Sequence, residues 1–304
     1  MAPIVKQVSS IDNLPSLVHR ALSSVPESGP YPRFVIDEVL NRTEYLRLLA
    51  SFPDNLISNP GHDGFINYNI RHGDNVSVDL SNEWSHFLEC VRSPKVVADL
   101  VKATYKHTTR RYPMLWRFLL YPRLRNPRNY MINVAFSANY AGRYLAPHSD
   151  NSYKVLALVL YFADPGTDSP TEGTQFYRPR SRKVLRAAIR RFNRLSDSRL
   201  TKFTPIELLP MASSFIFNGA SSPSEREKNE AWFYENFEND FNVNFFENRI
   251  AGFIKTQNSF HAVDMRESTF AGPRRSLLIN LNLKHSLPAR AWQSFRTRVL
   301  GLSS

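Results

Sequence analysis

Hydrophobic residues follow two different spacings, and the change from one to the other comes near residue 112. Before that point, apolar residues recur every three to four positions, as on one face of a helix, over residues 11–25, 43–50 and 81–106. The last stretch is interrupted at Pro94, because a helix interior does not tolerate proline. We therefore expect residues 1–112 to form a mainly helical N-terminal part that packs on the remainder of the chain.

From residue 113 onward the pattern is typical of β-structure. Residues 154–162, KVLALVLYF, form a nearly continuous apolar run, as in a strand that is buried on both faces. Shorter strand-like segments lie at 131–138, 174–177, 205–209, 213–217, 249–255 and 276–283, and one more lies earlier, at 33–37. Many short strands separated by Gly, Pro and Asn turns indicate a sandwich or barrel. The expected fold class is therefore mainly β with α (α+β).

Residues 178–247 interrupt this β pattern, and we interpret them as a helical insertion in a domain spanning residues 113–304. Within the insertion, residues 180–195 read as a strongly basic helix. A second segment has a phenylalanine every fourth residue, which suits a helix face on the core or, alternatively, an apolar cover over an opening. These phenylalanines are Phe233, Phe237, Phe241 and Phe245. A closing helix is expected over residues 286–300.

Composition narrows the class of protein. Hydrophobic residues make up 42 % of the 304 residues, enough for a sizeable core, and the 21 Phe and 13 Tyr suggest thick aromatic packing. The single cysteine, Cys90, excludes an internal disulfide framework and a cysteine-based zinc site, and it suits a reducing compartment. Residues 1–14 lack the pattern of a secretory signal, and no apolar run reaches the roughly 20 residues of a membrane span. We expect a soluble, cytoplasmic protein.

The formal net charge of +12 leaves two interpretations open. Arginine-rich faces can simply be solvated, or they can attract an anionic partner such as a phosphorylated metabolite, a glycan, nucleic acid or a membrane surface. Charge alone does not choose among these partners.

Candidate chemistry centres on His148, Asp150 and His261. Residues i and i+2 of a strand point the same way, so His148 and Asp150 can reach one metal ion together. Two imidazoles and one carboxylate on one face of ferrous iron leave three positions open for oxygen and a second substrate. The third ligand, His261, would come from a distant strand that lies alongside in the fold. The pattern predicts a mononuclear iron site.

The His-x-Asp triplet is weak by itself, because the same pattern stands at residues 72–74 (His-Gly-Asp). We interpret that second triplet as a loop, since its surroundings are turn-like and no buried strand follows. The triplet at 148–150 is instead flanked by β-rich segments. His261 follows the strand-like run 249–255, and Arg274 and Arg275 then open the apolar run SLLINLNL. The order of these parts carries the prediction.

In this order the sequence resembles the iron(II)- and 2-oxoglutarate-dependent oxygenases of the prolyl-hydroxylase-like branch. The resemblance covers about residues 130–283 and is carried by YAGRYLAPHSD (140–150), VLALVLYF (155–162), EGTQFY (172–177), NRIAGFIKTQNSFHAV (248–263) and PRRSLLINL (273–281). It implies a double-stranded β-helix (jelly-roll) core. It also implies hydroxylation of a substrate C–H bond, while 2-oxoglutarate and O2 become succinate and CO2.

The resemblance also implies roles for particular residues. His148, Asp150 and His261 would bind Fe(II), and an arginine at the start of the last strand would bind the far carboxylate of 2-oxoglutarate. The family spacing favours Arg274, while Arg275 keeps a similar distance from His261, so both stay candidates. An arginine suits this role because its planar fork pairs bidentately with a carboxylate.

Three further side chains have weaker assignments. Tyr161 either assists the binding of that carboxylate or is a core aromatic, and Tyr144 and Asn133 are candidates for lining the pocket.

Glu172-Gly173 departs from the family's Gly-Gly, which we expect to affect a turn. The aspartate ligand favours hydroxylation over halogenation.

The substrate class stays open among a small molecule, a glycan and a peptide side chain, and the basic helix favours an anionic one. A nucleic-acid demethylase of the same superfamily is an alternative. It is disfavoured because its second arginine, six residues after the first, is replaced by Asn280 (from Arg274) or Leu281 (from Arg275). A catalytically inactive jelly-roll binding module is the other alternative. The sequence predicts no oligomeric state.

Overall fold

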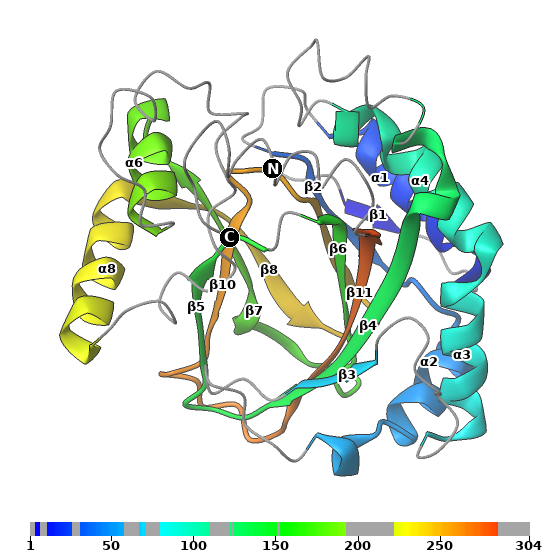
Figure 1. The fold of residues 1–304 in the computed structure, drawn as a ribbon. Helices are drawn as coiled ribbons and strands as arrows, with labels where there is room; N and C mark the ends of the chain where they lie inside the picture. The colour runs from blue at the N-terminus through cyan, green and yellow to red at the C-terminus, as the bar shows by residue number, and fades with distance from the viewer. Residues whose placement is uncertain are drawn as a thin grey trace.

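The computed structural model describes residues 4–6, 11–25, 31–57, 67–70, 80–109, 122, 124–150, 153–192 and 222–284 of the chain (Figure 1). Several expectations lie outside these residues: the strands at 205–209 and 213–217, the closing helix at 286–300, and the second His-x-Asp triplet at 72–74. No helix in the described part of the chain is long and apolar enough to cross a membrane.

The described strands form two sheets. The larger sheet has the order β1-β2-β9-β6-β11-β4-β3, and the smaller has the order β5-β10-β7-β8. The strands are β1 (Ile4–Lys6), β2 (Arg33–Asp37), β3 (Asn67–Ile70), β4 (Tyr130–Asn139), β5 (Tyr144–His148), β6 (Lys154–Tyr161), β7 (Asp168–Pro179), β8 (Phe237–Phe246), β9 (Ile250–Ile254), β10 (Phe260–Asp264) and β11 (Arg274–Leu283). All pairs are antiparallel except β1 with β2. The mixed helix-and-sheet class expected from the sequence is confirmed.

Helices cover the outer face of the larger sheet (Figure 1). They are α1 (Leu14–Ser23), α2 (Arg42–Ala50), α3 (Asn82–Arg92) and α4 (Pro94–Thr109), with short 3-10 turns η1 (Ile11–Asn13), η2 (Asp54–Leu56) and η3 (Pro127–Asn129). The side chain of Asn41 accepts a hydrogen bond from the Glu44 backbone N–H and so caps α2. Pro94 starts α4, where its missing N–H costs nothing. The helices expected in this part of the chain are confirmed.

The main core lies between these helices and the larger sheet. Trp84 of α3 packs edge-on against Phe136 of β4, with ring centroids 4.7 Å apart, and also contacts Phe162 just beyond β6. Outward residues alternate with inward ones along β4 and β11, so every second residue of these two strands joins this core. Strand β6 contributes Leu156, Leu158 and Leu160 to it. The N-terminal 112 residues also contribute β1, β2 and β3 to the sheet.

A second packed layer lies in the part of the interior where β7 and β8 face β6 and β9. Phe176 of β7 and Phe245 of β8 pack with Phe253 of β9 and Tyr161 of β6. A third layer lies on the outer face of the smaller sheet, where α6 (Arg182–Phe192) and α8 (Pro223–Asn236) pack against β7 and β10. Figure 1 shows these two helices on the side of the molecule opposite to α1–α4.

The insertion expected at 178–247 is therefore not wholly helical, because it supplies β8. Of the four regularly spaced phenylalanines, only Phe233 lies on a helix. Spacing by four also suits one face of a strand, and the pairing of β8 with β7 shifts register between Phe176 and Tyr177. As a result Phe237 packs under α6 and α8, whereas Phe241 and Phe245 belong to the layer between the sheets.

Candidate metal centre

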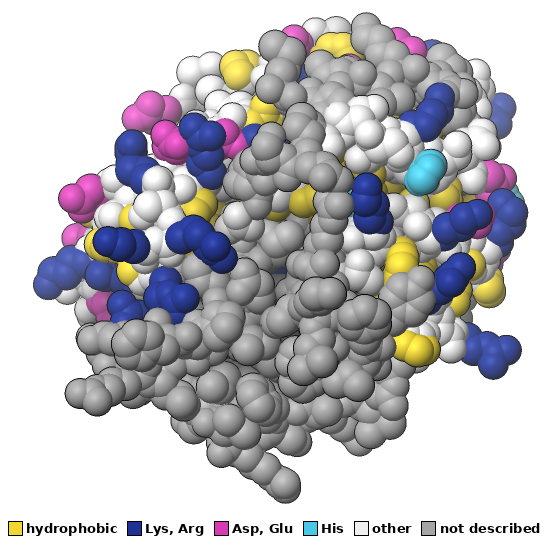
Figure 2. Space-filling model, turned by 90° about the horizontal axis from the view of Figure 1, so that it is seen from above, with side chains coloured by type: hydrophobic (Ala, Val, Ile, Leu, Met, Phe, Trp, Pro, Cys, Tyr) yellow, Lys and Arg dark blue, Asp and Glu magenta, His cyan; other side chains and the backbone are white. Residues whose placement is uncertain are grey.

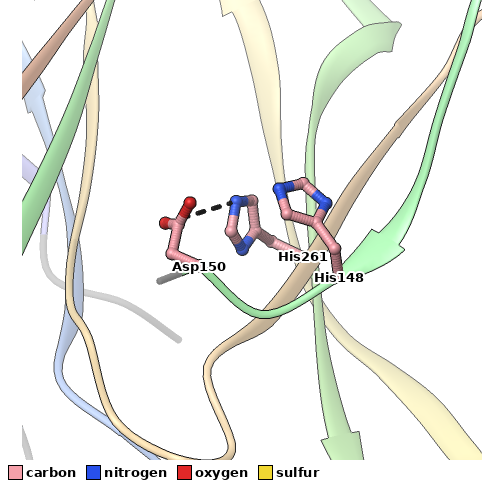
Figure 3. A group of neighbouring side chains, drawn as sticks. All are labelled: His148, Asp150 and His261. Atoms are coloured by element: carbon pink, nitrogen blue, oxygen red, sulfur yellow. Dashed lines mark ion pairs between the residues drawn. The ribbon is translucent and has the colours of Figure 1, made fainter. Parts of the chain in front are cut away.

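The smaller sheet brings the three predicted metal ligands together. His148 ends β5, and it lies directly opposite His261 of β10 in the antiparallel pairing. Asp150 follows two residues after the end of β5. One ligand atom from each of the three side chains lies within 4.8 Å of the other two, and all three residues are buried (Figure 3). His261, although distant in the sequence, thus lies beside His148 and Asp150, as expected.

Both imidazoles are held in the tautomer that a metal ion needs. Nδ1 of His148 lies 2.9 Å from the carbonyl oxygen of Ala146, and Nδ1 of His261 lies 3.2 Å from that of Ser259. A carbonyl oxygen only accepts hydrogen bonds, so Nδ1 donates in each case and Nε2 carries the lone pair. These backbone partners could not be identified from the sequence, and they orient the rings as is common for metal-binding histidines.

Asp150 has one oxygen bound and one oxygen without a partner. Its Oδ1 accepts a hydrogen bond from the Lys154 ammonium at 2.7 Å. Its Oδ2 is buried, makes no hydrogen bond within the described part of the chain, and lies 3.9 Å from Nε2 of His261. A buried, unpaired carboxylate oxygen is costly unless a cation or donor binds it. The donor set therefore fits a divalent metal ion held by Oδ2 and two Nε2 atoms.

The protonation states suit the same ion. Burial lowers the pKa of His261 to about 3, helped by the neighbouring His148, and burial also lowers the pKa of His148. Burial alone would raise the pKa of Asp150, but the positive charge of Lys154 and the adjacent imidazoles hold it well below its ordinary value. At neutral pH the centre thus presents two neutral imidazoles and one carboxylate.

Two lysines beside the ligands were not singled out from the sequence. Lys154 opens β6, four residues after Asp150, and it lies mostly buried with 14 % of its side chain exposed. Lys255 follows β9, is fully buried, and donates a hydrogen bond to Ser149 Oγ. Ser149 is the middle residue of the triplet and points away from the ligands. A charged residue at the head of the otherwise apolar run 154–162 was the available signal for Lys154.

The two candidate arginines point to opposite sides of the larger sheet. Arg274 faces inward and is 2 % exposed, and its guanidinium donates hydrogen bonds to the Glu172 carbonyl and to Ser276 Oγ. It lies 5.1 Å from the centroid of the Tyr161 ring. Arg275 faces outward and forms an ion pair with Asp54 at 2.8 Å. The alternation of side chains in β11 makes this separation unavoidable.

Arg274 is a buried cation without a carboxylate partner in the described residues. Burial lowers its pKa, although an arginine stays protonated at neutral pH. Beside it, the Tyr161 hydroxyl lies 2.5 Å from Thr174 Oγ1, and Phe245 closes the other side of the guanidinium. A buried charge of this kind calls for an anion. Tyr161 and Thr174 therefore line a small polar site at Arg274.

Glu172 and Gly173, where the sequence departs from the related pattern, lie within β7 and not in a turn. The pairing of β7 with β8 is irregular between Ser169 and Thr174. A Cβ atom at Gly173 would lie 1.9 Å from the Val243 carbonyl oxygen, so only glycine allows this approach. Glu172 is buried and accepts hydrogen bonds from Ser169, Thr171 and Ser268, which fixes the carbonyl that holds Arg274.

Of the two residues expected to line the pocket, one lies on an inner face of a sheet and the other on an outer face. Asn133 lies on the inner face of β4, opposite Asn280 of β11. Tyr144 lies on the outer face of the smaller sheet, where its hydroxyl donates to Glu230 of α8 at 2.7 Å. The register between β5 and β10 shifts between His261 and Val263. This bulge reverses the side to which Tyr144 points relative to His148.

Neither a protein-family model nor a curated protein matches the sequence. Solved structures do resemble the fold. They include a prolyl-4-hydroxylase from Pseudomonas putida, with 12 % identity, coverage of 89 % of this chain and 99 % of that one, and a TM-score of 0.45. They also include a 2OG-Fe(II) oxygenase-family oxidoreductase from Burkholderia pseudomallei, with 12 % identity, coverage of 92 % and 95 %, and a TM-score of 0.41.

A third similar structure is the Kdo hydroxylase KdoO, a non-heme Fe(II) and α-ketoglutarate-dependent dioxygenase in complex with cobalt(II). It shares 13 % identity, with coverage of 99 % of this chain and 97 % of that one, and a TM-score of 0.41. Oxygenases of this class are thus among the solved structures that resemble the fold. The residues of the site form a candidate metal centre of two histidines and one carboxylate. A buried arginine, Arg274, lies on the inner face of the larger sheet.

Proposed function

We propose that this protein is an iron(II)- and 2-oxoglutarate-dependent dioxygenase that hydroxylates a C–H bond of its substrate. The observation that carries the proposal is the ligand set itself: two free Nε2 lone pairs and the unpaired Oδ2 of Asp150 converge inside the molecule. Two histidines and one carboxylate with open positions are the donor set of non-haem Fe(II) oxygenases. When bound, the iron would let 2-oxoglutarate and O2 act together as the oxidant, which would give succinate, CO2 and a hydroxylated product, with one oxygen atom of O2 in succinate and the other in the product.

The strand order supports a jelly-roll (double-stranded β-helix) core. From β4 to β11 the chain crosses from one sheet to the other at every step except β7 to β8, with β4, β6, β9 and β11 in the larger sheet and β5, β7, β8 and β10 in the smaller. Such a fold places side chains of both inner faces around one interior space. We propose that residues 113–304 form this oxygenase domain and that residues 1–112 pack on it.

Within this proposal, His148, Asp150 and His261 hold the metal ion. Arg274 binds the far carboxylate of 2-oxoglutarate, because it is the inward arginine and has no carboxylate partner in the described residues. The Tyr161 and Thr174 hydroxyls lie beside it to hydrogen-bond that carboxylate. Arg275 has no such role, since Asp54 already pairs with it at the surface. The aromatic walls of Phe176 and Phe253 against His261 keep bulk water from that side of the centre.

Metal binding and 2-oxoglutarate turnover test the proposal. Purified protein is expected to bind one Fe(II) or Co(II) ion by equilibrium dialysis, and to release succinate from 2-oxoglutarate slowly even without substrate. His148→Ala and Asp150→Ala should each abolish metal binding. A wild-type protein that binds neither ion and releases no succinate would refute the proposal.

The two neighbouring arginines provide a matched pair of variants for the cosubstrate. Arg274→Lys should weaken 2-oxoglutarate binding at least tenfold, since the bidentate fork is lost. Arg275→Lys should leave that affinity unchanged, because the side chain lies on the opposite face of β11. Equal effects of the two variants would contradict the assignment of Arg274.

A further inference from the structure

The inner faces of β4 and β11 are polar where the outer faces are apolar. Outward residues of the two strands, such as Phe136 and Leu281, belong to the main core. The inward positions instead carry Asn133 and Asn280, directly opposite each other, and Asn282 two residues further along β11. We call Asn133, Asn280 and Asn282 the amide face. Asparagine is uncommon on the inner face of a packed sheet unless it has a partner to bind.

The amide face belongs to the same interior as the metal centre. Asn282 pairs with Lys154 of β6, whose ammonium holds Asp150 at 2.7 Å. The packed layer between the sheets joins β7 and β8 to β2, β6 and β9. This leaves β5 and β10, which carry the histidines, to face β4 and β11, consistent with their places in Figure 1.

This part of the interior is not filled by core packing from the described residues. Asn133 and Asn280 are partly exposed, although they lie on an inner face. The inward Leu278 and Met131 are also partly exposed and belong to none of the apolar clusters, unlike the inward Ala157 and Phe253. Asn133 and Asn280 are therefore partly accessible from the interior, whereas Asn282 is buried beside them.

One atom of the amide face is a buried hydrogen-bond acceptor without a donor. Asn282 is 2 % exposed, and its Oδ1 is buried with no hydrogen-bond partner in the described part of the chain. A buried amide oxygen needs a donor. A carboxylate or phosphate oxygen only accepts, and an ammonium group would be repelled by Lys154, so a neutral donor suits this position best.

We propose that the amide face binds neutral hydroxyl groups of the substrate, and that the substrate is a polyhydroxylated molecule of the sugar or polyol type. A hydroxyl both donates and accepts, as an amide does. The three amides lie on two strands, about 5 Å apart across the pair and about 7 Å apart along β11, and so form a two-dimensional array. An extended peptide presents its N–H groups in one row, which fits this array less well.

The basic surface is a separate feature. Figure 2 shows Lys and Arg side chains on both sides of this face of the molecule, including the side where α6 lies, and α6 packs on the outer face of the smaller sheet. This charge lies on the surface. In the interior, Lys154 is paired with Asp150, and Arg274 is the buried cation that the proposed function assigns to 2-oxoglutarate. The binding of a polyhydroxylated molecule is inferred from the amide face alone. Only the statement that this molecule is the substrate that is oxidised rests on the proposed function.

Saturation-transfer difference NMR on the full chain tests the proposal with defined probes. The probes are neutral monosaccharides and alditols, the matching uronic acids and sugar phosphates, and short blocked neutral peptides. We expect signals from neutral polyhydroxylated probes. Asn280→Leu and Asn282→Leu should each weaken binding about tenfold. Asn242→Leu, an exposed position on the outer face of β8, should not.

Circular dichroism and Co(II) binding show whether each variant keeps its fold and metal centre. Binding of acidic probes or peptides alone, no binding by any probe, or wild-type affinity in both amide-face variants would each overturn the proposal. The test is separate from that of the proposed function. Neutral probes that bind through the amide face of a protein without metal or 2-oxoglutarate turnover would leave this inference standing and remove the enzyme activity.

Discussion

Replacing Lys154 by methionine isolates the ion pair that supports the candidate metal centre. In the metal-free protein Lys154 Nζ lies 2.7 Å from Asp150 Oδ1, and the two side chains are 14 % and 11 % exposed. Removing one partner of a buried pair leaves a buried, uncompensated charge, which typically costs about 3–5 kcal/mol. Because both groups keep slight solvent contact, we expect Lys154→Met to lower the free energy of unfolding by about 3 kcal/mol.

A surface pair with the same residue types provides the control. Lys95 and Asp99 lie 3.6 Å apart with side chains 79 % and 46 % exposed. An exposed pair of this kind contributes at most about 0.5 kcal/mol. Urea unfolding of metal-free protein at pH 7 should therefore separate Lys154→Met clearly from Lys95→Met.

Two additional measurements identify the cause of the loss. Asp150→Asn combined with Lys154→Met should be more stable than Lys154→Met alone, because the unpaired charge is gone. Co(II) should stabilise Lys154→Met more than the wild type, since the cation then supplies the missing positive charge at Asp150. The reasoning is refuted if Lys154→Met unfolds within 1 kcal/mol of the wild type, or no differently from Lys95→Met.

Two other predictions follow from the packing and the histidines. Gly173→Ala should destabilise the fold by several kcal/mol, because the added Cβ would clash with the Val243 carbonyl oxygen. Gly272→Ala is the control and should change stability little, since its Cβ would have its nearest contact at 3.4 Å. Equal thermal unfolding midpoints of the two variants would contradict the need for glycine at residue 173. Burial lowers the pKa of His261 in the folded protein to about 3, whereas a histidine in the unfolded chain has a pKa of about 6.5. Below pH 6.5 the unfolded chain therefore binds a proton that the folded protein does not. The free energy of unfolding of the metal-free protein should therefore fall by about 2 kcal/mol from pH 7 to pH 5. This fall should be smaller in His261→Asn. A urea midpoint that stays constant from pH 7 to pH 5 would exclude a buried neutral imidazole.

Local sequence was enough to predict most of the described elements. The run 154–162 appears as β6, the helix expected at 43–50 appears as α2, and Pro94 separates α3 from α4. Periodicity misled in one place, since phenylalanines four residues apart suit one face of a strand as well as a helix. The stretch that begins at Phe237 is therefore a strand.

The sequence by itself determined the chemical identity of the candidate ligands, because their residue types, order and strand context are properties of the chain. It also placed Arg274 and Arg275 at the start of the last strand, but it could not choose between them. Tertiary structure separated the two, since the alternation of β11 turns Arg274 inward, while Asp54 from the N-terminal part binds Arg275 outside.

Other decisions likewise depended on contacts between distant strands. A register shift between β5 and β10 turned Tyr144 away from the interior, and a local pattern does not encode such a shift. The pairing of β11 with β4 and β6 brought Asn133, Asn280 and Lys154 around Asn282. Sequence specifies which groups are available, but burial and register decide which of them share one interior, because both arise only when strands far apart in the chain lie side by side.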